Sequence, residues 1–230
     1  MSATMKIIST TERAAFYKTL YSRRDTRGEF KNDAVPDEIL MRILDAAHHA
    51  PSVGFMQPWD FIVVKSPEIK KRIKAGFEAA HKEAAALFPK DKQAQYQSFK
   101  LEGIVEAPVG ICITCDRSRT GNVVIGRTAN PETDLYSAVC AVQNLWLAAR
   151  SENLGVGWMS IIHHDCLKAI LGIPEKIVPI AYLNIGFVSY FYEQPELEKK
   201  GWLPRLPLSS LLHWDGWRKK SKCLQDTEHI

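Results

Sequence analysis

The stretch that governs the predicted fold is Thr133-Asp134-Leu135-Tyr136-Ser137-Ala138-Val139-Cys140-Ala141-Val142-Gln143-Asn144-Leu145-Trp146-Leu147-Ala148-Ala149-Arg150-Ser151. Its apolar residues recur at the spacing of an α-helix and extend round most of the helix surface. A helix that is apolar on nearly every side is buried, either at the centre of a domain or at an interface between subunits. The stretch therefore predicts a long buried helix that ends before Asn153-Leu154-Gly155.

Strand and helix patterns alternate on both sides of this helix, which indicates an α/β or α+β fold class. The expected strands are Asp60–Val64, Val109–Thr114, Ile177–Val188 and a short strand or turn at Val156–Ile161. The expected helices are about Thr10–Ser22 after the capping box Ser9-Thr10-Thr11-Glu12, one starting at Val35-Pro36-Asp37-Glu38, Pro67–Leu87 and His164–Leu171. The polar stretch Pro89–Gln97 is either an exposed helix or a mobile lid.

The composition is that of an ordinary globular protein. Of 230 residues, 46% are hydrophobic and 24% are charged, which fits one domain or one domain with extensions. The net charge of +4 is too small to indicate nucleic-acid binding. The N-terminus has no apolar signal region, and no run reaches the ~18 apolar residues that a membrane span needs. We therefore expect a soluble cytoplasmic protein with neither a membrane nor a nucleic-acid partner.

The cysteines and histidines point away from disulfides and metals. Five cysteines, an odd number, indicate a reducing compartment. Cys112-Ile-Thr-Cys115 has the spacing of a redox motif, but it lies inside a predicted buried strand rather than at a loop-to-helix junction. His48-His49 and His163-His164 are adjacent pairs, and no second set of ligands stands at metal spacing. We expect no metal site.

A second stretch, Ser22-Arg23-Arg24-Asp25-Thr26-Arg27-Gly28-Glu29-Phe30, carries three guanidinium groups within five positions. If the preceding helix continues, Arg23 and Arg27 share a face at i,i+4. The planar fork of arginine matches a phosphate bidentately and stays charged at physiological pH. The stretch is therefore either a set of forks that converge on a dianion, or a solvated helix end whose Arg–Asp pairs contribute about 0.2–1 kcal/mol each.

Asp25 makes this stretch unusual for a phosphate site. A carboxylate 4 Å from a phosphate charge is repelled by about 1 kcal/mol in water, and by about 4 kcal/mol at an effective dielectric constant of 20. A site that only holds phosphate would favour Ser or Thr at this position. Asp25 is therefore either neutralised by its arginine neighbours or has a chemical task.

A shaped loop is expected at Ala50-Pro51-Ser52-Val53-Gly54-Phe55-Met56-Gln57-Pro58-Trp59. Its prolines and its glycine prevent regular structure. The mixture of small residues, a hydroxyl, an amide and aromatic rings suits a loop that lies against a planar ligand. A plain connecting loop is the alternative.

Five motifs in order resemble those of the nitroreductase-type flavoprotein family. They are Ser22-Arg23-Arg24-x-x-Arg27, Ala50-Pro51-Ser52 with Gln57-Pro58-Trp59, the long apolar helix, Gly155-x-Gly157-Trp158, and Arg205-x-Pro207-Leu208. Each is weak alone, but together they cover about Arg23 to Leu208. The resemblance implies an α+β fold with a mixed sheet flanked by helices, an extended C-terminal arm, and a domain-sharing homodimer with one FMN at each of two interface sites.

The resemblance also implies the residues of the site and the domain boundaries. Arg23, Arg24, Arg27 and Arg205 match phosphate and ribityl contacts, Pro51 and Ser52 from the partner subunit match the loop beside the flavin, and Trp158, Met159 and Ser160 match the segment near the ring edge. Their neighbours Asp25, Thr26 and Met56 complete the predicted cofactor-binding set. The implied parts are a helix at 1–21, the FMN domain at 22–210 and a tail at 211–230.

Within that family the motifs resemble one branch that destroys its flavin. The features in common are Arg23-Arg24-Asp25-x-Arg27, the loop Ala50–Trp59, Asp134-Leu135-Tyr136-Ser137, the helical stretch Val139–Trp146 and Gly157-Trp158-x-Ser160. The reductases and deiodinases of the family usually have a small residue where this chain has Asp25. In this branch reduced FMN is a substrate that reacts with molecular oxygen and is fragmented to dimethylbenzimidazole and a tetrose phosphate. Asp25 is then expected to move protons beside the ribityl chain, and Ser160 to hydrogen-bond the flavin.

The source of electrons and the competing functions stay open. Electrons would come from NAD(P)H, either directly or through a separate flavin reductase. The main alternative is an NAD(P)H-dependent FMN enzyme that reduces nitroaromatics or quinones. A third alternative is a module that stores FMN or senses nucleotides without turnover. Nucleic-acid binding is the remotest, because no aromatic residues are interleaved with the few arginines.

Overall fold

The computed structural model describes residues 7–219. Its contacts divide the chain into two units, Met1–Glu193 and Gln194–Ile230, and each unit is described by itself. The boundaries expected after residues 21 and 210 stay a prediction, and residues 220–230 of the expected tail lie outside the described range.

The first unit is built from helices and strands that mostly lie where the sequence patterns place them. In chain order they are α1 (Thr10–Ser22), α2 (Asp37–His48), the 3₁₀ turn η1 (Val53–Phe55), β1 (Trp59–Val64), α3 (Pro67–Leu87), α4 (Lys90–Gln97), β2 (Val109–Asp116), α5 (Thr133–Ser151), β3 (Leu154–Met159), α6 (His164–Leu171) and β4 (Ile177–Phe187). The predicted bounds of α5 and α6 are confirmed to the residue, and α3 ends at Leu87, where its end was expected approximately.

The four strands form one sheet in the order β1-β2-β4-β3, and every pair of neighbours is antiparallel. A sheet with both parallel and antiparallel strands was expected. Within residues 7–219, parallel pairing occurs only at the isolated bridge between Asp25 and Val156. Because β2 and β4 lie in the centre, both of their faces are covered, which explains why both read as nearly continuous apolar runs. β3 lies at an edge, where further backbone can pair with it.

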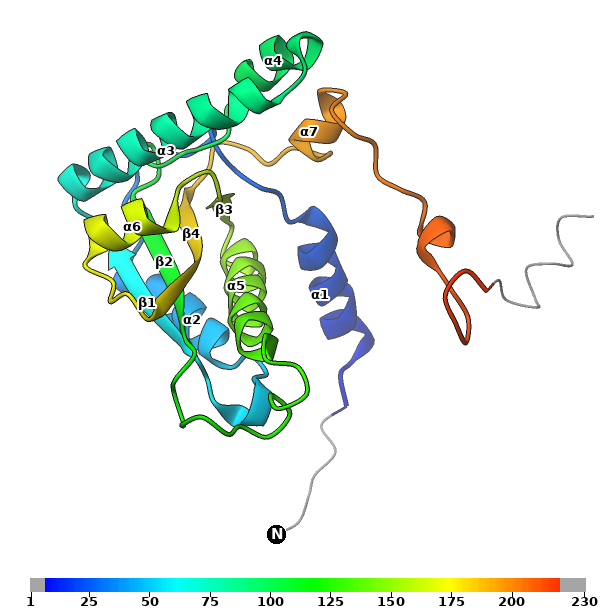
Figure 1. Cartoon of the computed structure of the whole chain (residues 1–230). Coiled ribbons are helices and arrows are strands. Elements are labelled where there is room, and N and C mark those ends of the chain that lie inside the picture. The colour runs from blue at the N-terminus through cyan, green and yellow to red at the C-terminus, as the bar shows by residue number, and fades with distance from the viewer. Residues whose placement is uncertain (1–6, 220–230) are drawn as a thin grey trace, which may run out of the picture. The chain divides into compact units, whose positions relative to one another are not determined.

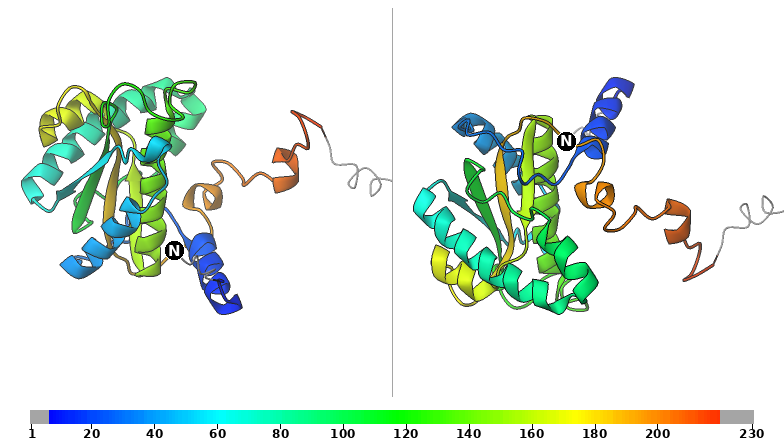
Figure 2. Two further views of the ribbon diagram at one scale, coloured as in Figure 1. Left: turned by 90° about the horizontal axis from the view of Figure 1, so that it is seen from below. Right: turned by 90° about the horizontal axis from the view of Figure 1, so that it is seen from above.

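The sheet lies between two helical layers, seen from three sides in Figures 1 and 2. On one face α2 and α5 share a core with alternate residues of β2, among them Ile111 and Ile113. On the other face α3 and α6 pack around Cys112 and Tyr182. The face of α2 toward the sheet is apolar, and its residues Leu40, Ile43 and Ala47 are buried.

The redox spacing of Cys112 and Cys115 falls inside β2, where both side chains are 0% exposed. Burial raises the pKa of each thiol to about 12. A reactive cysteine needs a thiolate and access, and these two residues have neither at neutral pH. The expectation that they belong to a buried strand is confirmed.

Among residues 194–219, the described part of the second unit, there are two short elements, α7 (Glu196–Lys199) and the 3₁₀ turn η2 (Leu208–Leu211). Between them residues 203–207 have no regular structure, as the two prolines predict. The expected C-terminal arm stays a prediction. Over residues 7–219, no helix combines the length and apolarity needed to cross a membrane, and the expected location in the cytoplasm also stays a prediction.

Candidate active site

The arginine stretch leaves α1 and joins the edge of the sheet. Arg23 caps α1 in an extended conformation, with φ −63° and ψ 133°. Asp25 then pairs with Val156, and the Thr26 N–H donates to the Val156 carbonyl at 3.0 Å. The Asp25 side chain adds a further bond, because its Oδ1 accepts the Trp158 N–H at 3.0 Å. Two stretches predicted from the sequence to form the site are therefore in direct contact.

Two glycines of β3 allow this close approach. A Cβ on Gly157 would lie 2.1 Å from the Thr26 carbonyl oxygen, and one on Gly155 would lie 2.9 Å from Thr26 Oγ1. Any larger residue would push the arginine stretch off the strand. Thr26, predicted as a cofactor contact, is 3% exposed, with its side chain packed against β3. The Gly155-x-Gly157 motif thus serves the junction between two backbone segments.

Asp25 is subject to opposing electrostatic effects. Its Oδ2 bonds Arg27 Nη2 at 2.5 Å, and its side chain is 31% exposed. Burial raises the pKa of Asp25 above the ordinary 3.8, and this outweighs the lowering effects of Arg27, the Trp158 N–H and Arg23. The carboxyl therefore keeps its proton to a higher pH than a solvated aspartate does. A partly desolvated carboxyl with a raised pKa, held beside arginines, is a candidate for proton transfer.

Arg23 and Arg27 do not share a helix face, so the i,i+4 prediction is wrong. The helix ends one residue before Arg23, because pairing with β3 makes the chain extended there. The Arg23 guanidinium lies over the ring of Trp146, 4.7 Å from its centroid. Arg27 pairs with Asp25, and its side chain is 13% exposed. Both cations nevertheless lie near Asp25, and the positive charge of each lowers its pKa.

Arg24 binds the protein's own backbone. Its Nη1 donates to the carbonyls of Tyr21 and Arg23 at 2.7 Å each, and its Nη2 donates to the carbonyl of Glu193. Its Nε is buried and makes no hydrogen bond within the described residues. Arg24 therefore fastens the end of α1 to the end of the first unit. A phosphate bound by Arg24 would compete with three carbonyls.

Trp158, Met159 and Ser160 form the end of the edge strand and the residue after it. Met159 is 2% exposed in the core, whereas Ser160 is exposed, and its hydroxyl makes no hydrogen bond within residues 7–219. Residues two apart in an extended segment are roughly 7 Å apart at Cα, so Ser160 lies near the bond from Trp158 to Asp25. A depression of about 120 Å³ adjoins all three residues, with α6 and β4 as its other walls.

Three residues of the loop at 51–57 have a left-handed backbone conformation. Gly54, Phe55 and Gln57 have φ of 52°, 53° and 48°. Ser52 supports this shape from inside, since its Oγ accepts the Gln57 N–H and its carbonyl accepts the Phe55 N–H, both at 3.1 Å. The sequence correctly predicts an irregular loop.

This loop and the arginine stretch lie near opposite ends of α5 (Figure 1). The Val53 N–H donates to Ser137 Oγ at 3.0 Å, whereas Trp146 Nε1 donates to the Arg24 carbonyl at 3.3 Å. Ser137 and Trp146 are nine residues apart, which is about 13 Å along a helix axis. One copy of the described chain therefore does not bring the two halves of the expected site together.

The remaining predicted residues differ in accessibility. Pro51 is exposed and Ser52 is half-buried, so both are accessible from outside. Met56 is 2% exposed and anchors the loop in the protein, which leaves little of its side chain for a ligand. Arg205 belongs to the second unit, where its N–H donates to Glu198 Oε1 at 3.1 Å. Its role stays a prediction.

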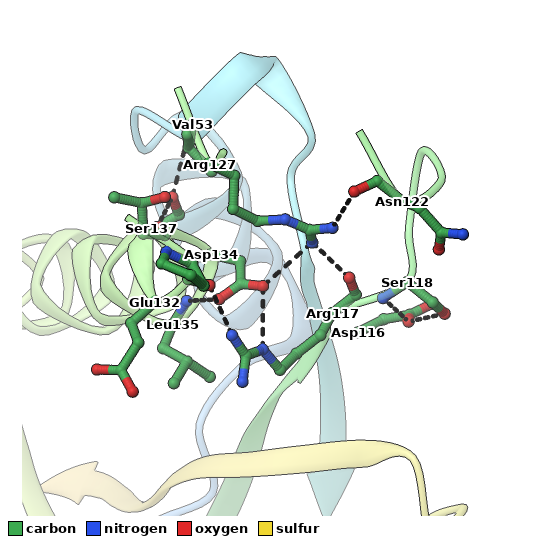
Figure 3. Close-up of polar contacts among 12 residues, drawn as sticks. Val53, Asp116, Arg117, Ser118, Asn122, Arg127, Glu132, Asp134, Leu135 and Ser137 are labelled. Atoms are coloured by element: carbon green, nitrogen blue, oxygen red, sulfur yellow. Dashed lines mark hydrogen bonds and ion pairs between the residues drawn. The ribbon is translucent and has the colours of Figure 1, made fainter. Parts of the chain in front are cut away.

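A buried ionic network near the loop was not predicted from the sequence. Asp134 is 0% exposed, and its Oδ2 accepts from Arg117 Nε at 3.1 Å and from Arg127 Nη1 at 3.2 Å. Figure 3 shows the carboxylate between the two guanidinium groups. An aspartate in the first turn of an otherwise apolar helix, after a loop with several arginines, was the available signal. Trp146 was likewise expected only as an apolar residue.

Comparisons with known proteins agree with the resemblance found in the sequence. Residues 20–187 match the model of the nitroreductase family. The chain is 40% identical over 185 residues to the 5,6-dimethylbenzimidazole synthase of Rhodospirillum rubrum, with 80% of this chain and 87% of the relative covered. It is 33% identical over 197 residues to the enzyme of the same name from Rhodobacter capsulatus, covering 86% and 95%.

Solved structures bear on the fold. The crystal structure of oxidized iodotyrosine deiodinase bound to FMN and 3-iodo-L-tyrosine superposes with a TM-score of 0.66 at 22% identity. The match covers 77% of this chain and 91% of the deiodinase chain. The predicted nitroreductase-like α+β fold is confirmed.

Proposed function

The chain belongs to the nitroreductase family, and from this premise we propose that it is a 5,6-dimethylbenzimidazole synthase with reduced FMN as its substrate. The observation that carries the proposal is the Asp25 carboxyl, which has a raised pKa, lies among arginines and is bonded to the end of β3. A reductase needs no acid at this position. A synthase that cleaves the ribityl chain does need one.

The donor set fits the phosphate end of FMN. Arg23 and Arg27 stay charged at any physiological pH and offer planar forks. Arg205 is proposed to join them, on the strength of the family resemblance alone. Arg24 is proposed to act mainly by fixing the position of this stretch, because its Nη groups are bonded to carbonyls.

Asp25 is proposed to transfer protons at the ribityl chain. Each carboxylate oxygen has two acceptor sites, so the bonds to Trp158 and Arg27 leave one site on each oxygen for a ligand hydroxyl. Ser160, exposed two residues beyond Trp158, is proposed to hydrogen-bond the flavin ring. Reduced flavin supplies the electrons that oxygen accepts and the atoms of the benzimidazole.

A homodimer is proposed to complete the site. Ser137 and Trp146, the α5 residues that contact the loop and the arginine stretch, lie about 13 Å apart along the helix axis. A second copy is therefore proposed to supply Pro51 and Ser52. Apolar side chains exposed on this chain support such an assembly. They are Phe16 at 55% on α1, and Tyr136 at 52% and Val139 at 41% on α5.

The overall reaction is proposed to take reduced FMN and molecular oxygen and to release 5,6-dimethylbenzimidazole and a tetrose phosphate. NAD(P)H is the proposed indirect source of electrons, through a separate flavin reductase. The protein must then admit oxygen while excluding bulk water, which is a reason to close the site between two subunits.

The direct test mixes the purified protein with chemically reduced FMN in air and measures dimethylbenzimidazole by mass spectrometry. We expect the product to appear as FMN is consumed, and to be absent when oxygen is excluded. Steady NAD(P)H oxidation with intact FMN would instead identify a nitroaromatic or quinone reductase. FMN that binds tightly and survives in air without turnover would identify a storage module.

A further inference from the structure

Arg119, which lies outside the loop that carries Pro51 and Ser52, binds the backbone at the end of that loop. We propose that Arg119 is a positioning residue, which keeps residues 51–57 in the left-handed shape needed to contact the flavin of the other subunit. The identity of the ligand rests on the proposed function. The mechanical part of the proposal rests on the contacts of Arg119 alone.

The loop has a shape that the chain would not adopt without support. Phe55 and Gln57 lie in the left-handed region at φ 53° and 48°, which residues other than glycine seldom occupy. Such residues persist where their surroundings impose the conformation, and they gather at functional sites. The loop therefore requires contacts from other parts of the chain.

Arg119 supplies these contacts at the point where the loop ends. Its Nη1 donates to the carbonyls of Gln57 at 2.8 Å and Trp59 at 2.9 Å. Its Nη2 donates to both carboxylate oxygens of Asp60, at 2.7 and 2.6 Å. One planar fork thus binds the left-handed Gln57 and the start of β1 at the same time. A lysine keeps the charge but has no such fork.

The same segment of chain closes over the loop at Gly54. A Cβ at Gly54 would lie 2.5 Å from Val124 Cγ1 and 3.0 Å from the Ile125 carbonyl oxygen. From the other side, a Cβ on Gly126 would lie 3.1 Å from Val53 Cγ2. Residues 124–126 therefore pack directly against Val53 and Gly54 of the loop.

Residues 117–134 are themselves anchored to α5. Arg127 Nη2 donates to the carbonyls of Gly121 and Asn122 at 3.3 and 3.2 Å, and its Nη1 reaches the buried Asp134 (Figure 3). This anchor fixes the segment that carries Arg119. Asp134 is a poor variant for testing the loop, since its loss would disturb the whole segment.

The test compares Arg119→Gln with Arg42→Gln. Arg42 makes a matched bidentate pair with Glu152, at 2.8 and 3.0 Å, and that pair contains no loop carbonyl. Three quantities are measured in each full-length variant: hydrogen exchange at the Phe55 and Gln57 amides, the Kd for oxidised FMN by fluorescence titration, and the midpoint of thermal unfolding without FMN.

For Arg119→Gln we expect exchange at both amides to quicken about tenfold and the Kd for FMN to rise about tenfold, since the loop must be ordered again on binding. Arg42→Gln should resemble the unmodified protein, and both variants should have similar unfolding midpoints. The exchange rates and the Kd of Arg119→Lys should lie between those of Arg119→Gln and those of the unmodified protein, because lysine restores one donor group but not the planar fork.

Unchanged exchange in Arg119→Gln would overturn the proposal. Faster exchange with an unchanged Kd would also overturn it, because the loop would then be held for stability alone. If the unmodified protein binds no FMN, the proposed function fails. In that case the flavin-positioning role falls with it, while the exchange data still decide whether Arg119 holds the loop.

Discussion

The stretch 23–27 on β3 and the segment 116–134 beside η1 both place arginines next to aspartates, but the aspartates respond in opposite ways. Burial raises the pKa of Asp25 despite the adjacent Arg27. The pKa of Asp116 is lowered, chiefly because its Oδ1 accepts the Ser118 hydroxyl at 2.6 Å. Figure 3 shows Asp116 and Ser118 at the edge of the network around Asp134.

The difference lies in what each region does with its charged groups. In segment 116–134, Arg119 and Arg127 bind carbonyls and carboxylates of their own chain and so determine the shape of a loop. In the stretch 23–27, the carboxylate is desolvated at a strand end with arginine and tryptophan around it. The same residue types thus serve architecture in one region and, under the proposed function, chemistry in the other.

Asp25→Asn should produce the largest effect. We expect the yield of dimethylbenzimidazole to fall by about 10²- to 10⁴-fold, the usual contribution of a general acid or base. FMN binding should persist, because an asparagine oxygen can still accept the Trp158 N–H. Product is measured by mass spectrometry with reduced FMN in air, and Asp116→Asn serves as the control with normal yield. An undiminished yield in Asp25→Asn would exclude the proton-transfer role.

Asp134→Ala should produce the largest loss of stability. The substitution leaves Arg127, whose side chain is 13% exposed, without its buried carboxylate. Breaking a buried pair in this way costs about 3–5 kcal/mol. Urea unfolding should report this loss, while Glu152→Ala, which removes the partner of the 56% exposed Arg42, should cost about 0–1 kcal/mol. If Asp134→Ala and Glu152→Ala lowered the free energy of unfolding equally, the ion pairs of Asp134 would stabilise the protein no more than a surface pair does.

Arg27→Met tests the binding side of the comparison. A hydrogen bond to a charged group contributes about 1.5–3 kcal/mol, so the Kd for FMN should rise about 10- to 100-fold. Riboflavin has no phosphate, and its Kd should stay nearly constant. Arg42→Met, which alters a 56% exposed arginine bonded to Glu152, should change neither Kd. If Arg27→Met raised the Kd for FMN and the Kd for riboflavin by the same factor, Arg27 would not bind the phosphate.

Local signals in the sequence were sufficient for most helices. Ser9 and Glu12 form the capping box at α1, and Ser66 accepts the Ile69 N–H before the proline of α3. These bonds join residues three positions apart, so a short window of sequence contains both partners. The sequence placed the ends of strands less accurately. β2 extends to Asp116 because Cys115 and Asp116 pair with Val178 and Ile177 of β4.

The site required information that no short window contains. Asp25 bonds to Trp158, 133 positions further along the chain, and this contact is what turns the arginine stretch from helix to extended chain. Arg119 reaches back 62 positions to Gln57. The sequence correctly marked Asp25 as unusual and 51–57 as an irregular loop. It could not reveal that Arg24 binds carbonyls, or that Arg119 supports the loop.

The pH dependence of stability is the smallest effect expected, and it separates the two aspartates by sign. For Asp25 the folded pKa is raised, so between pH 3.8 and that raised value the folded state holds more protons than the unfolded chain. The stability that Asp25 contributes is complete below pH 3.8 and is lost as the pH rises through the folded pKa. For Asp116 the folded pKa is lowered, so its contribution is present above pH 3.8 and is lost as the pH falls through the folded pKa. Urea unfolding of Asp25→Asn and Asp116→Asn over this range should therefore show differences from the unmodified protein that slope in opposite directions, and slopes of one sign would remove the distinction between the two regions.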